Sequence, residues 1–406
     1  MLETTALGQH PVDITDQSFE TLGLSEAALK LINHVGFKNP TPIQSAVIPT
    51  AIQGRDIIGL AQTGSGKTAA FVLPLTERLL HGSGLRGLIL CPTREIALQT
   101  KAFLDLFGKH HRLNTVCIIG GVSMGPQIRD LQKRPDIIVA TPGRLVDHME
   151  RGFVRLDKIE ELVLDEADHM LDLGFMPQLK AILRKVPQKR HTMMFSATMP
   201  ATIASLAQQF LHNPFRVDIL PKGRAAEGIT HRLYLVDKEN KKNCLLALLH
   251  LELGSTLVFT RTKRDTDWIC RILQKEGHPV TSMHSDRSQR ERINALYGFR
   301  KGQHRILVAT DIASRGLDVS GIQHIVNYDI PATVEDYIHR AGRTARIGAL
   351  GLVSTIATWL DKTMVRDIER ALGKTLPRCT VAGVKPYVEL PVVRHFGRRP
   401  ARRGRR

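Results

Sequence analysis

Short apolar runs recur along the chain, and segments with helical spacing separate them. The runs are rich in Val, Ile and Leu and do not alternate with polar residues, which is typical of parallel strands covered on both faces. They are "GLILC" (87–91), "DIIVA" (136–140), "ELVLD" (161–165), "TMMF" (192–195), "TLVF" (256–259), "RILVAT" (305–310) and "HIVNY" (324–328). Regular alternation of strand and helix predicts doubly wound α/β domains with parallel sheets.

The segment "LSEAALKLINHVG" (24–36) illustrates the helical spacing. Its apolar residues share one helical face: Leu24, Ala28, Leu31, Ile32 and Val35. Ser25 is a suitable N-cap and Gly36 a suitable C-terminal stop, so the pattern predicts a helix between them.

The pattern breaks at "DILPKGRAAEGITH" (218–231), where proline, glycine and small residues gather. We therefore predict a first domain at 1–218, a linker at 219–228 and a second domain at 229–375. The chain ends in "RHFGRRPARRGRR", which has seven arginines and little apolar surface to bury. Residues 376–406 are predicted to form a disordered basic tail.

The charge balance points to a polyanionic partner. The 406 residues include 57 Lys and Arg against 39 Asp and Glu, a formal charge of +18. Such an excess favours nucleic acid, although a merely solvated basic surface is the alternative. Aromatic residues are only 5% of the chain, so base stacking on an aromatic platform is not the expected mode of binding.

The cysteines and the N-terminus indicate the compartment. Five cysteines are scattered without C-x-x-C spacing, which argues against a zinc site and a disulfide framework and for reduced thiols. The N-terminus lacks the pattern of a signal peptide, and no apolar run approaches the roughly 20 residues of a membrane span. We expect a cytoplasmic protein.

The stretch "GLAQTGSGKTAAF" (59–71) has the features of a phosphate-binding loop. "DIIGLA" (56–61) reads as a strand that leads into it, and "KTAAFVLPLTERLL" (67–80) reads as a helix that follows it. Gly64 and Gly66 let the backbone curl so that its N–H groups meet phosphate oxygens. Lys67 supplies charge for the β- and γ-phosphates, and Thr68 supplies a hydroxyl for Mg²⁺. Ala61 stands where the general pattern has glycine, which changes only the entry to the loop.

An apolar strand that ends in acids, "LVLDEAD" (162–168), provides the other half of such a site. Asp165 would hold Mg²⁺ through water, and Glu166 would orient and deprotonate the attacking water. The alternative is a solvated acidic helix start, since acids favour helix N-termini.

With these motifs the sequence resembles the DEAD-box ATP-dependent RNA helicases of superfamily 2, most of all their short bacterial RhlE-like members. The resemblance runs from about Phe19 to Gly351 and rests on many motifs in order. It implies two tandem RecA-like domains, ATP and Mg²⁺ as cofactors, and a monomer. "AQTGSGKT" is the form that the loop takes in this family, so Ala61 is expected there.

The resemblance also assigns the ATP site. "GFKNPTPIQ" (36–44) is similar to the adenine-recognition element, in which Gln44 would read the base and Phe37 would pack on it. The residues implied to bind ATP are Phe19, Phe37, Gln44, Thr63, Gly64, Ser65, Gly66, Lys67, Thr68 and Asp318. Those implied to act in hydrolysis are Lys67, Asp165, Glu166 and the arginine fingers Arg343 and Arg346, with Thr68 and Asp165 at the metal.

The RNA contacts follow from further motifs of the family. They are Thr93, Arg94, Gly121, Thr141, Arg144, Arg261, Gln289, Arg292 and Thr310. "SAT" (196–198) is expected to hydrogen-bond near Asp168, and His339 and Arg340 are expected to reach the other domain. Ser285 and Ala345 replace residues more usual in the family, which leaves fine loop geometry open.

The expected mechanism is an ATP-gated clamp on RNA. The phosphate loop and Glu166 lie in one domain and the fingers in the other, so ATP and RNA together should close the cleft. Binding through sugar and phosphate would be largely independent of RNA sequence, with a role in ribosome assembly or RNA turnover. A DNA translocase and an RNA-binding protein without hydrolysis are the alternatives.

Overall fold

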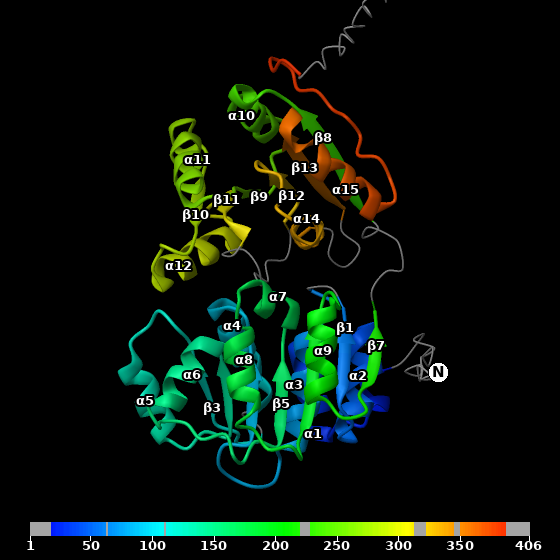
Figure 1. Cartoon of the computed structure of the whole chain (residues 1–406), viewed down its shortest axis with the longest axis vertical. Helices are drawn as coiled ribbons and strands as arrows, with labels where there is room; N and C mark the ends of the chain where they lie inside the picture. The colour runs from blue at the N-terminus through cyan, green and yellow to red at the C-terminus, as the bar shows by residue number, and fades with distance from the viewer. Residues whose placement is uncertain are drawn as a thin grey trace, which may run out of the picture.

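The computed structural model describes residues 18–61, 64–108, 111–219, 228–311, 322–344 and 350–386. These form two α/β domains, one above the other in Figure 1, each built on its own parallel sheet. The predicted linker at 219–228 lies almost wholly outside the described residues, as do Thr63, Asp318 and Arg346.

The first domain holds a seven-stranded sheet in the order β3-β4-β2-β5-β6-β1-β7. Its elements are η1 (Phe19–Leu22), α1 (Glu26–Val35), α2 (Pro42–Ile52), β1 (Ile57–Leu60), α3 (Lys67–Arg78), β2 (Gly87–Leu90), α4 (Arg94–Gly108), β3 (Thr115–Ile118), α5 (Met124–Gln132), β4 (Ile137–Ala140), α6 (Pro142–Glu150), β5 (Glu161–Leu164), α7 (Ala167–Asp172), α8 (Met176–Leu183), β6 (His191–Ser196), α9 (Ala201–Phe210) and β7 (Phe215–Asp218).

The second domain repeats this plan with six strands, in the order β10-β11-β9-β12-β13-β8. Its elements are β8 (Ile229–Leu235), η2 (Lys238–Asn240), α10 (Lys241–Leu251), β9 (Thr256–Phe259), α11 (Lys263–Lys275), β10 (Val280–Met283), α12 (Gln289–Arg300), β11 (Ile306–Ala309), β12 (His324–Asn327), α14 (Val334–Ala341), β13 (Gly351–Ala357), η3 (Trp359–Asp361) and α15 (Lys362–Leu372).

Each sheet is buried on both faces, as the unbroken apolar runs predict. In β1, Ile57 packs with α2 and α3 on one face, and Ile58 packs with α8 and α9 on the other. Two separate cores therefore sandwich each sheet, and all the strand pairs in both sheets are parallel. This confirms the predicted doubly wound architecture.

The seven strands predicted from apolar runs are all present, with ends that differ by one residue at most. The structure adds strands that the apolar runs did not reveal, namely β3, β7, β8, β10 and β13. β3, β7, β8 and β10 lie at sheet edges, where a strand has one neighbouring strand instead of two and fewer of its residues are buried.

The helix predicted between Ser25 and Gly36 is confirmed as α1. The Ser25 hydroxyl accepts a hydrogen bond from Ala28 N–H at 3.3 Å, and Gly36 ends the helix with φ of 86°. That left-handed conformation is the one glycine adopts without steric cost. No described helix has both the length and the hydropathy needed to cross a bilayer.

The predicted tail begins too early at residue 376. Leu376 is 2% exposed in the core of the second domain, and the segment up to Pro386 follows the outer edge of β8. Leu233 N–H donates to the Pro377 carbonyl at 2.8 Å. Apolar residues hold this segment on the domain, and the basic composition of 376–406 as a whole concealed them. Residues 387–406 lie outside the described residues.

Candidate ATP and RNA site

The phosphate loop joins β1 to α3, as the sequence predicts. Gly64 and Gly66 have φ of 86° and 93°, in the region that favours glycine. A Cβ at Gly66 would stand 2.4 Å from Gln44 Nε2, so this position has no room for a side chain. Lys67 is the first residue of α3, and its Nζ donates a hydrogen bond of 2.9 Å to the Ala61 carbonyl on the other side of the loop. The buried Ser65 hydroxyl has no hydrogen-bond partner among the residues that the structure describes, as expected of a loop shaped for phosphate.

Gln44 ties the adenine-recognition element to this loop. Its amide donates to the Gly66 carbonyl at 3.0 Å, and its Oε1 accepts from Thr41 N–H at 2.9 Å in a capping box at the start of α2. The side chain is therefore held in one orientation beside the phosphate loop. Phe37 stacks between Phe19 and Phe103, with ring centroids 6.5 and 6.3 Å away.

The two acids at the end of β5 have different electrostatic environments. Burial raises the pKa of Asp165 to about 7, although the Lys67 charge favours its ionised form. Burial also opposes ionisation of Glu166, but a 3.1 Å hydrogen bond with the His169 ring holds the pKa of Glu166 below its usual value. Glu166 is thus an ionised carboxylate, suited to accept a proton from water.

Asp168 connects the acidic run to the "SAT" element. Its Oδ2 accepts from Ala197 N–H at 3.1 Å, and from the N–H and hydroxyl of Thr198 at 2.8 and 2.9 Å. Asp168 N–H in turn donates to the Ser196 hydroxyl at 3.2 Å. These contacts confirm the predicted pairing of Ser196 and Thr198 with the acidic run.

The residues predicted at the metal fit Mg²⁺. Thr68 lies half-buried in the first turn of α3, and Asp165 directly follows β5. Mg²⁺ prefers oxygen ligands and is usually held by one or two protein groups together with phosphates and water. Among the described residues there is no group of three or more His, Cys, Asp or Glu that could hold a metal ion.

Arg343 reaches this site from the second domain. It is 4% exposed, and its positive charge contributes to the lowered pKa of Glu166. The structure therefore brings one predicted finger close to Glu166, the residue predicted to deprotonate the attacking water. The other finger, Arg346, and the predicted ribose ligand Asp318 lie outside the described residues, as does Thr63.

The RNA-binding residues predicted in the first domain converge. Arg94 at the start of α4 lies against Gly121, whose φ of 70° and lack of a side chain let the guanidinium approach. Arg144 in α6 donates to the Val122 carbonyl at 3.0 Å, and its charge reaches Arg94. Thr93 and Thr141 precede α4 and α6 and are buried. Clustered guanidiniums beside backbone amides are suited to phosphate.

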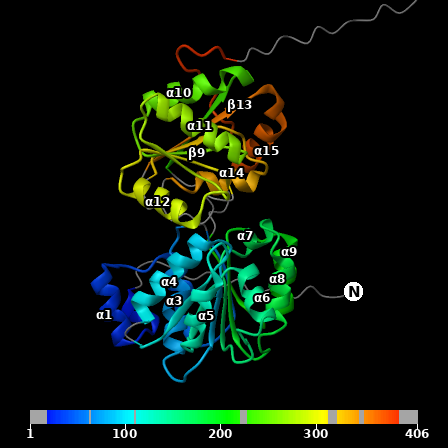
Figure 2. The same cartoon turned by 90° about the vertical axis from the view of Figure 1, so that its left-hand side faces the viewer.

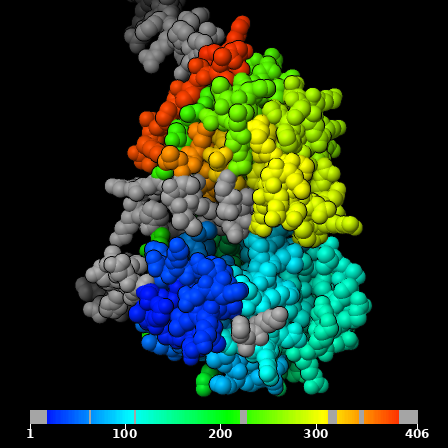
Figure 3. Space-filling view, turned by 180° about the vertical axis from the view of Figure 1, so that it is seen from behind, coloured from blue at the N-terminus to red at the C-terminus, as the bar shows by residue number. Residues whose placement is uncertain are grey.

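In the second domain, Gln289 and Arg292 face the first domain. Gln289 Nε2 donates to Glu95 Oε1 at 3.1 Å, and Arg292 lies 3.0 Å from Glu95 Oε2. Figures 1 and 2 place α12 above α4 accordingly, and Figure 3 shows the two domains meeting there. Arg261 is exposed and Thr310 is buried at the end of β11. Contact of these residues with RNA stays a prediction.

A cavity of about 770 Å³ lies between the domains beside the "SAT" element. Asp168 and Thr198 line it from below and His339 from above, in line with the expectation for His339. The expectation for Arg340 is wrong. Its guanidinium binds both carboxylate oxygens of Asp311, at 2.6 and 2.7 Å, within its own domain.

Sequence reasoning missed two residues of the site. Glu95 directly follows Arg94 in the motif "PTREIA", and an acid beside a predicted RNA-binding arginine was the available signal. His169 follows the acidic run directly, on the face of α7 that returns to Glu166. Both are buried. Glu95 pairs with Arg292, which lies close only in the folded chain, whereas His169 pairs with Glu166, three residues before it.

Two family models match the chain. The model described as DEAD/DEAH box helicase covers residues 41–206, and the model described as helicase conserved C-terminal domain covers residues 240–348. The chain is 41% identical over 345 residues to the DEAD-box ATP-dependent RNA helicase RhpA of Helicobacter pylori, covering 85% of this chain and 70% of the relative. It is 41% identical over 363 residues to CshA of Geobacillus kaustophilus, covering 89% and 78%.

Solved structures match both domains at once. Dbp5 of S. cerevisiae bound to RNA and ADP BeF3 superposes with a TM-score of 0.82 at 29% identity, covering 90% of this chain and 96% of that one. A DEAD box protein from Methanococcus jannaschii is 34% identical with 89% and 99% covered, yet its TM-score is 0.54. The resemblance in fold therefore extends over nearly the whole chain.

Proposed function

Since the chain belongs to the DEAD/DEAH box helicase family, we propose that it is an ATP-dependent RNA helicase whose domains close together on ATP and single-stranded RNA. The observation that carries the proposal is the position of Arg343. The charge of this residue of the second domain favours the ionised form of Glu166 in the first, which supports a hydrolysis site built from both domains.

The chain's own residues account for hydrolysis of ATP. The amides of the phosphate loop and Lys67 hold the phosphates, and Gln44 holds the base. Glu166 takes the proton from the attacking water, and Arg343 stabilises the charge that develops on the γ-phosphate. Mg²⁺, when bound near Thr68 and Asp165, supplies further neutralisation of phosphate charge.

Closure also accounts for strand separation. RNA held by Arg94 and Arg144 on one domain and by groups such as Arg261 on the other is contacted mainly through phosphate and sugar. A strand bent to follow both surfaces cannot remain in an A-form duplex, so short duplexes open locally. Release of phosphate removes the link between the domains and frees the strand. We place this activity in the cytoplasm, in ribosome assembly or RNA turnover, in keeping with the free cysteines.

The TM-scores support the proposal that the two domains close together on nucleotide and RNA. A whole-chain TM-score falls when two similar domains are placed differently. The score is 0.82 against Dbp5 bound to RNA and ADP BeF3 but 0.54 against the more identical M. jannaschii protein. The domains of this chain are thus placed as in the structure that holds RNA and a nucleotide.

The first test is ATP hydrolysis by the purified protein alone, with single-stranded RNA and with DNA of matching sequence, for the wild type and Glu166→Gln. We expect hydrolysis that RNA stimulates, that DNA stimulates little, and that the substitution abolishes. Equal stimulation by DNA would make the protein a general nucleic-acid helicase. RNA binding without hydrolysis would make it a binding protein.

A further inference from the structure

The second sheet has one edge that is covered and one that is open. The C-terminal segment pairs with β8 through Leu233 and Val236 and so covers that edge. At the opposite edge, β10 pairs with β11, and no other described segment pairs with it. Proteins usually protect an open edge with Lys, Pro or a bulge within the strand. The four-residue strand β10, "VTSM", contains no Lys, no Pro and no bulge, so these three devices do not block its outward backbone groups.

The backbone of β10 has hydrogen-bonding groups turned to the open side. The Pro279 carbonyl accepts from Ile306 N–H of β11 at 3.1 Å. Because consecutive residues of a strand turn their backbone groups to opposite sides, Thr281 also faces β11, whereas Val280 and Ser282 face outward. The open side therefore presents the N–H and C=O groups of both residues in the spacing of a sheet.

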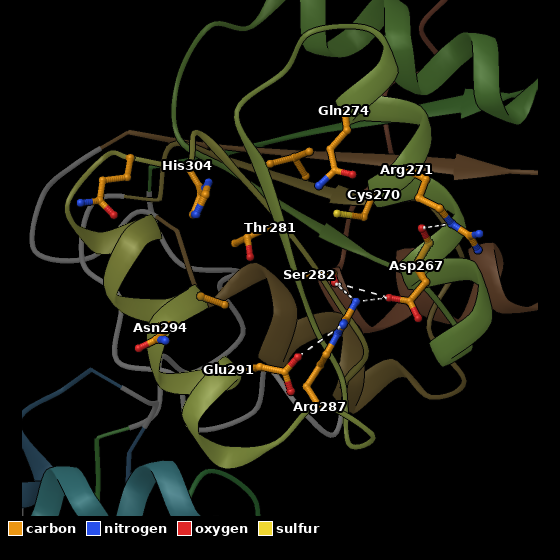
Figure 4. Close-up of a pocket in the computed structure, with 13 residues that line it drawn as sticks. Asp267, Cys270, Arg271, Gln274, Thr281, Ser282, Arg287, Glu291, Asn294 and His304 are labelled. Atoms are coloured by element: carbon orange, nitrogen blue, oxygen red, sulfur yellow. Dashed lines mark hydrogen bonds and ion pairs between the residues drawn. The ribbon is translucent and has the colours of Figure 1, made fainter.

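This edge is the floor of a groove of about 760 Å³ (Figure 4). Figure 4 shows Asp267 and Gln274 on the α11 wall, Glu291 and Asn294 on the α12 wall, and Ser282 between them. The volume is in the range of ordinary ligand sites. A strand-shaped floor between two helical walls suits an elongated occupant.

The charges that line the groove indicate whether a nucleic-acid strand or a peptide fits it better. Arg287 donates to Asp267 at 2.7 Å and to the Ser282 hydroxyl at 3.2 Å, and it lies 3.6 Å from Glu291. With Arg271, the lining holds two carboxylates and two guanidiniums, so it has no excess of positive charge. Phosphate backbones bind where basic charge is in excess, which a chain of +18 supplies elsewhere. The balanced charges and the amides of the lining instead match a polar peptide.

The groove is continuous with the contact between the domains. Glu291 lines the groove, and its neighbours in α12, Gln289 and Arg292, hold Glu95 of the first domain. A segment packed along α12 would therefore order the same helical turn that makes the closed contact. Binding in the groove and domain closure are then coupled, and each favours the other.

We propose that a partner protein adds an extended polar segment to the second sheet as a strand beside β10, and that this favours the closed arrangement. Main-chain hydrogen bonds to Val280 and Ser282 provide affinity, and the polar walls provide selectivity. The binding itself is independent of the proposed helicase activity, whereas its effect on closure rests on that activity.

The test uses the full-length protein and a display library of short linear peptides, selected in the presence of excess single-stranded RNA. Ser282→Pro removes one outward N–H at an edge position where proline is tolerated, and Ser282→Ala is the matched control that keeps it. Asn294→Trp fills the groove from α12 without altering the strand. We expect the enriched peptides to bind wild type and Ser282→Ala alike, and to lose about tenfold or more in affinity for the other two variants.

Three results would each overturn the binding site. The selection could enrich no peptide, or the enriched peptides could bind Ser282→Pro and Asn294→Trp as tightly as wild type. Hydrogen exchange could also show that RNA protects the β10 amides and that the peptide does not. RNA-stimulated hydrolysis without peptide is measured for the same proteins, so failure of the helicase proposal is seen separately. Coupling predicts that bound peptide lowers the RNA concentration needed for half-maximal hydrolysis. An unchanged concentration refutes the coupling.

Discussion

Arg343 lies 4% exposed at the boundary between the domains, and its charge acts on Glu166. We predict that Arg343→Ala lowers RNA-stimulated turnover by about a thousandfold, because an arginine finger stabilises charge that appears only in the transition state. ATP binding to the first domain should change little, since the phosphate loop is intact. Steady-state hydrolysis and nucleotide binding are measured side by side.

The matched control for Arg343 is Arg366→Ala, which removes an exposed arginine of the same domain. It should retain normal turnover. If Arg343→Ala also retains RNA-stimulated hydrolysis, Arg343 is not a finger and its charge serves only to orient the ionised Glu166.

The pairing of α12 with α4 depends on one acid. Glu95 is buried against Gln289 and Arg292, and loss of its charge leaves the Arg292 guanidinium buried without compensation. We predict that Glu95→Gln weakens RNA binding by about tenfold or more when an ATP analogue is present, because the closed arrangement loses this contact. Fluorescence anisotropy with labelled RNA measures the affinity for RNA with the ATP analogue and without nucleotide.

In the absence of nucleotide, Glu95→Gln should bind RNA nearly as wild type does. Glu150→Gln, an exposed acid at the end of α6, is the control and should change neither affinity. An equal loss with and without nucleotide would mean that Glu95 supports the RNA surface of the first domain and not closure.

Two buried histidines connect strands of the second sheet to their surroundings. His231 in β8 lies 2.8 Å from the Tyr337 hydroxyl, and His324 in β12 lies 2.9 Å from the Ser354 hydroxyl. Burial lowers the pKa of each to about 4. The fold therefore holds both imidazoles in the neutral form. The folded domain has its full stability only above the pKa that these histidines have in the unfolded chain, because below that pKa the unfolded chain binds protons that the folded domain does not.

We predict that the free energy of unfolding of the second domain falls as the pH drops from about 7 to 5, with about 2 kcal/mol from each histidine. The unfolded chain gains protons in this window and the folded domain does not. Urea unfolding of His324→Asn should show a shallower pH dependence than wild type, and His250→Asn, at an exposed position, should show the wild-type dependence. Parallel curves for all three would contradict this.

For the chain as a whole, the net charge of +18 and the seven arginines of 394–406 affect RNA binding beyond the site. We predict that deletion of 394–406 weakens RNA binding and flattens its dependence on salt, because fewer counterions are released. Replacement of the same arginines by lysine should preserve the slope. An unchanged slope after deletion would show that the tail does not contact RNA.

Much of the fold could be read from contiguous segments. A strand buried on both faces is apolar throughout, so "TLVF" predicts β9 to the residue. The phosphate loop and the acids after β5 are also short motifs, in which neighbouring residues form the chemical site together. Edge strands such as β10 were not predicted, because some of their residues are only partly buried and polar, so their sequences contain no continuous apolar run.

The contacts between distant residues required the folded chain. Glu95 and Gln289 are 194 positions apart, and nothing near either residue indicates the partner. Arg340 lies in a motif rich in basic residues, yet it binds Asp311 of its own domain and not the other domain. The sequence thus specified the local chemistry, because backbone curl, periodicity and charge reside in neighbouring residues. The pairing of charges across the domains depended on distances in space, which the packing of two complete sheets establishes.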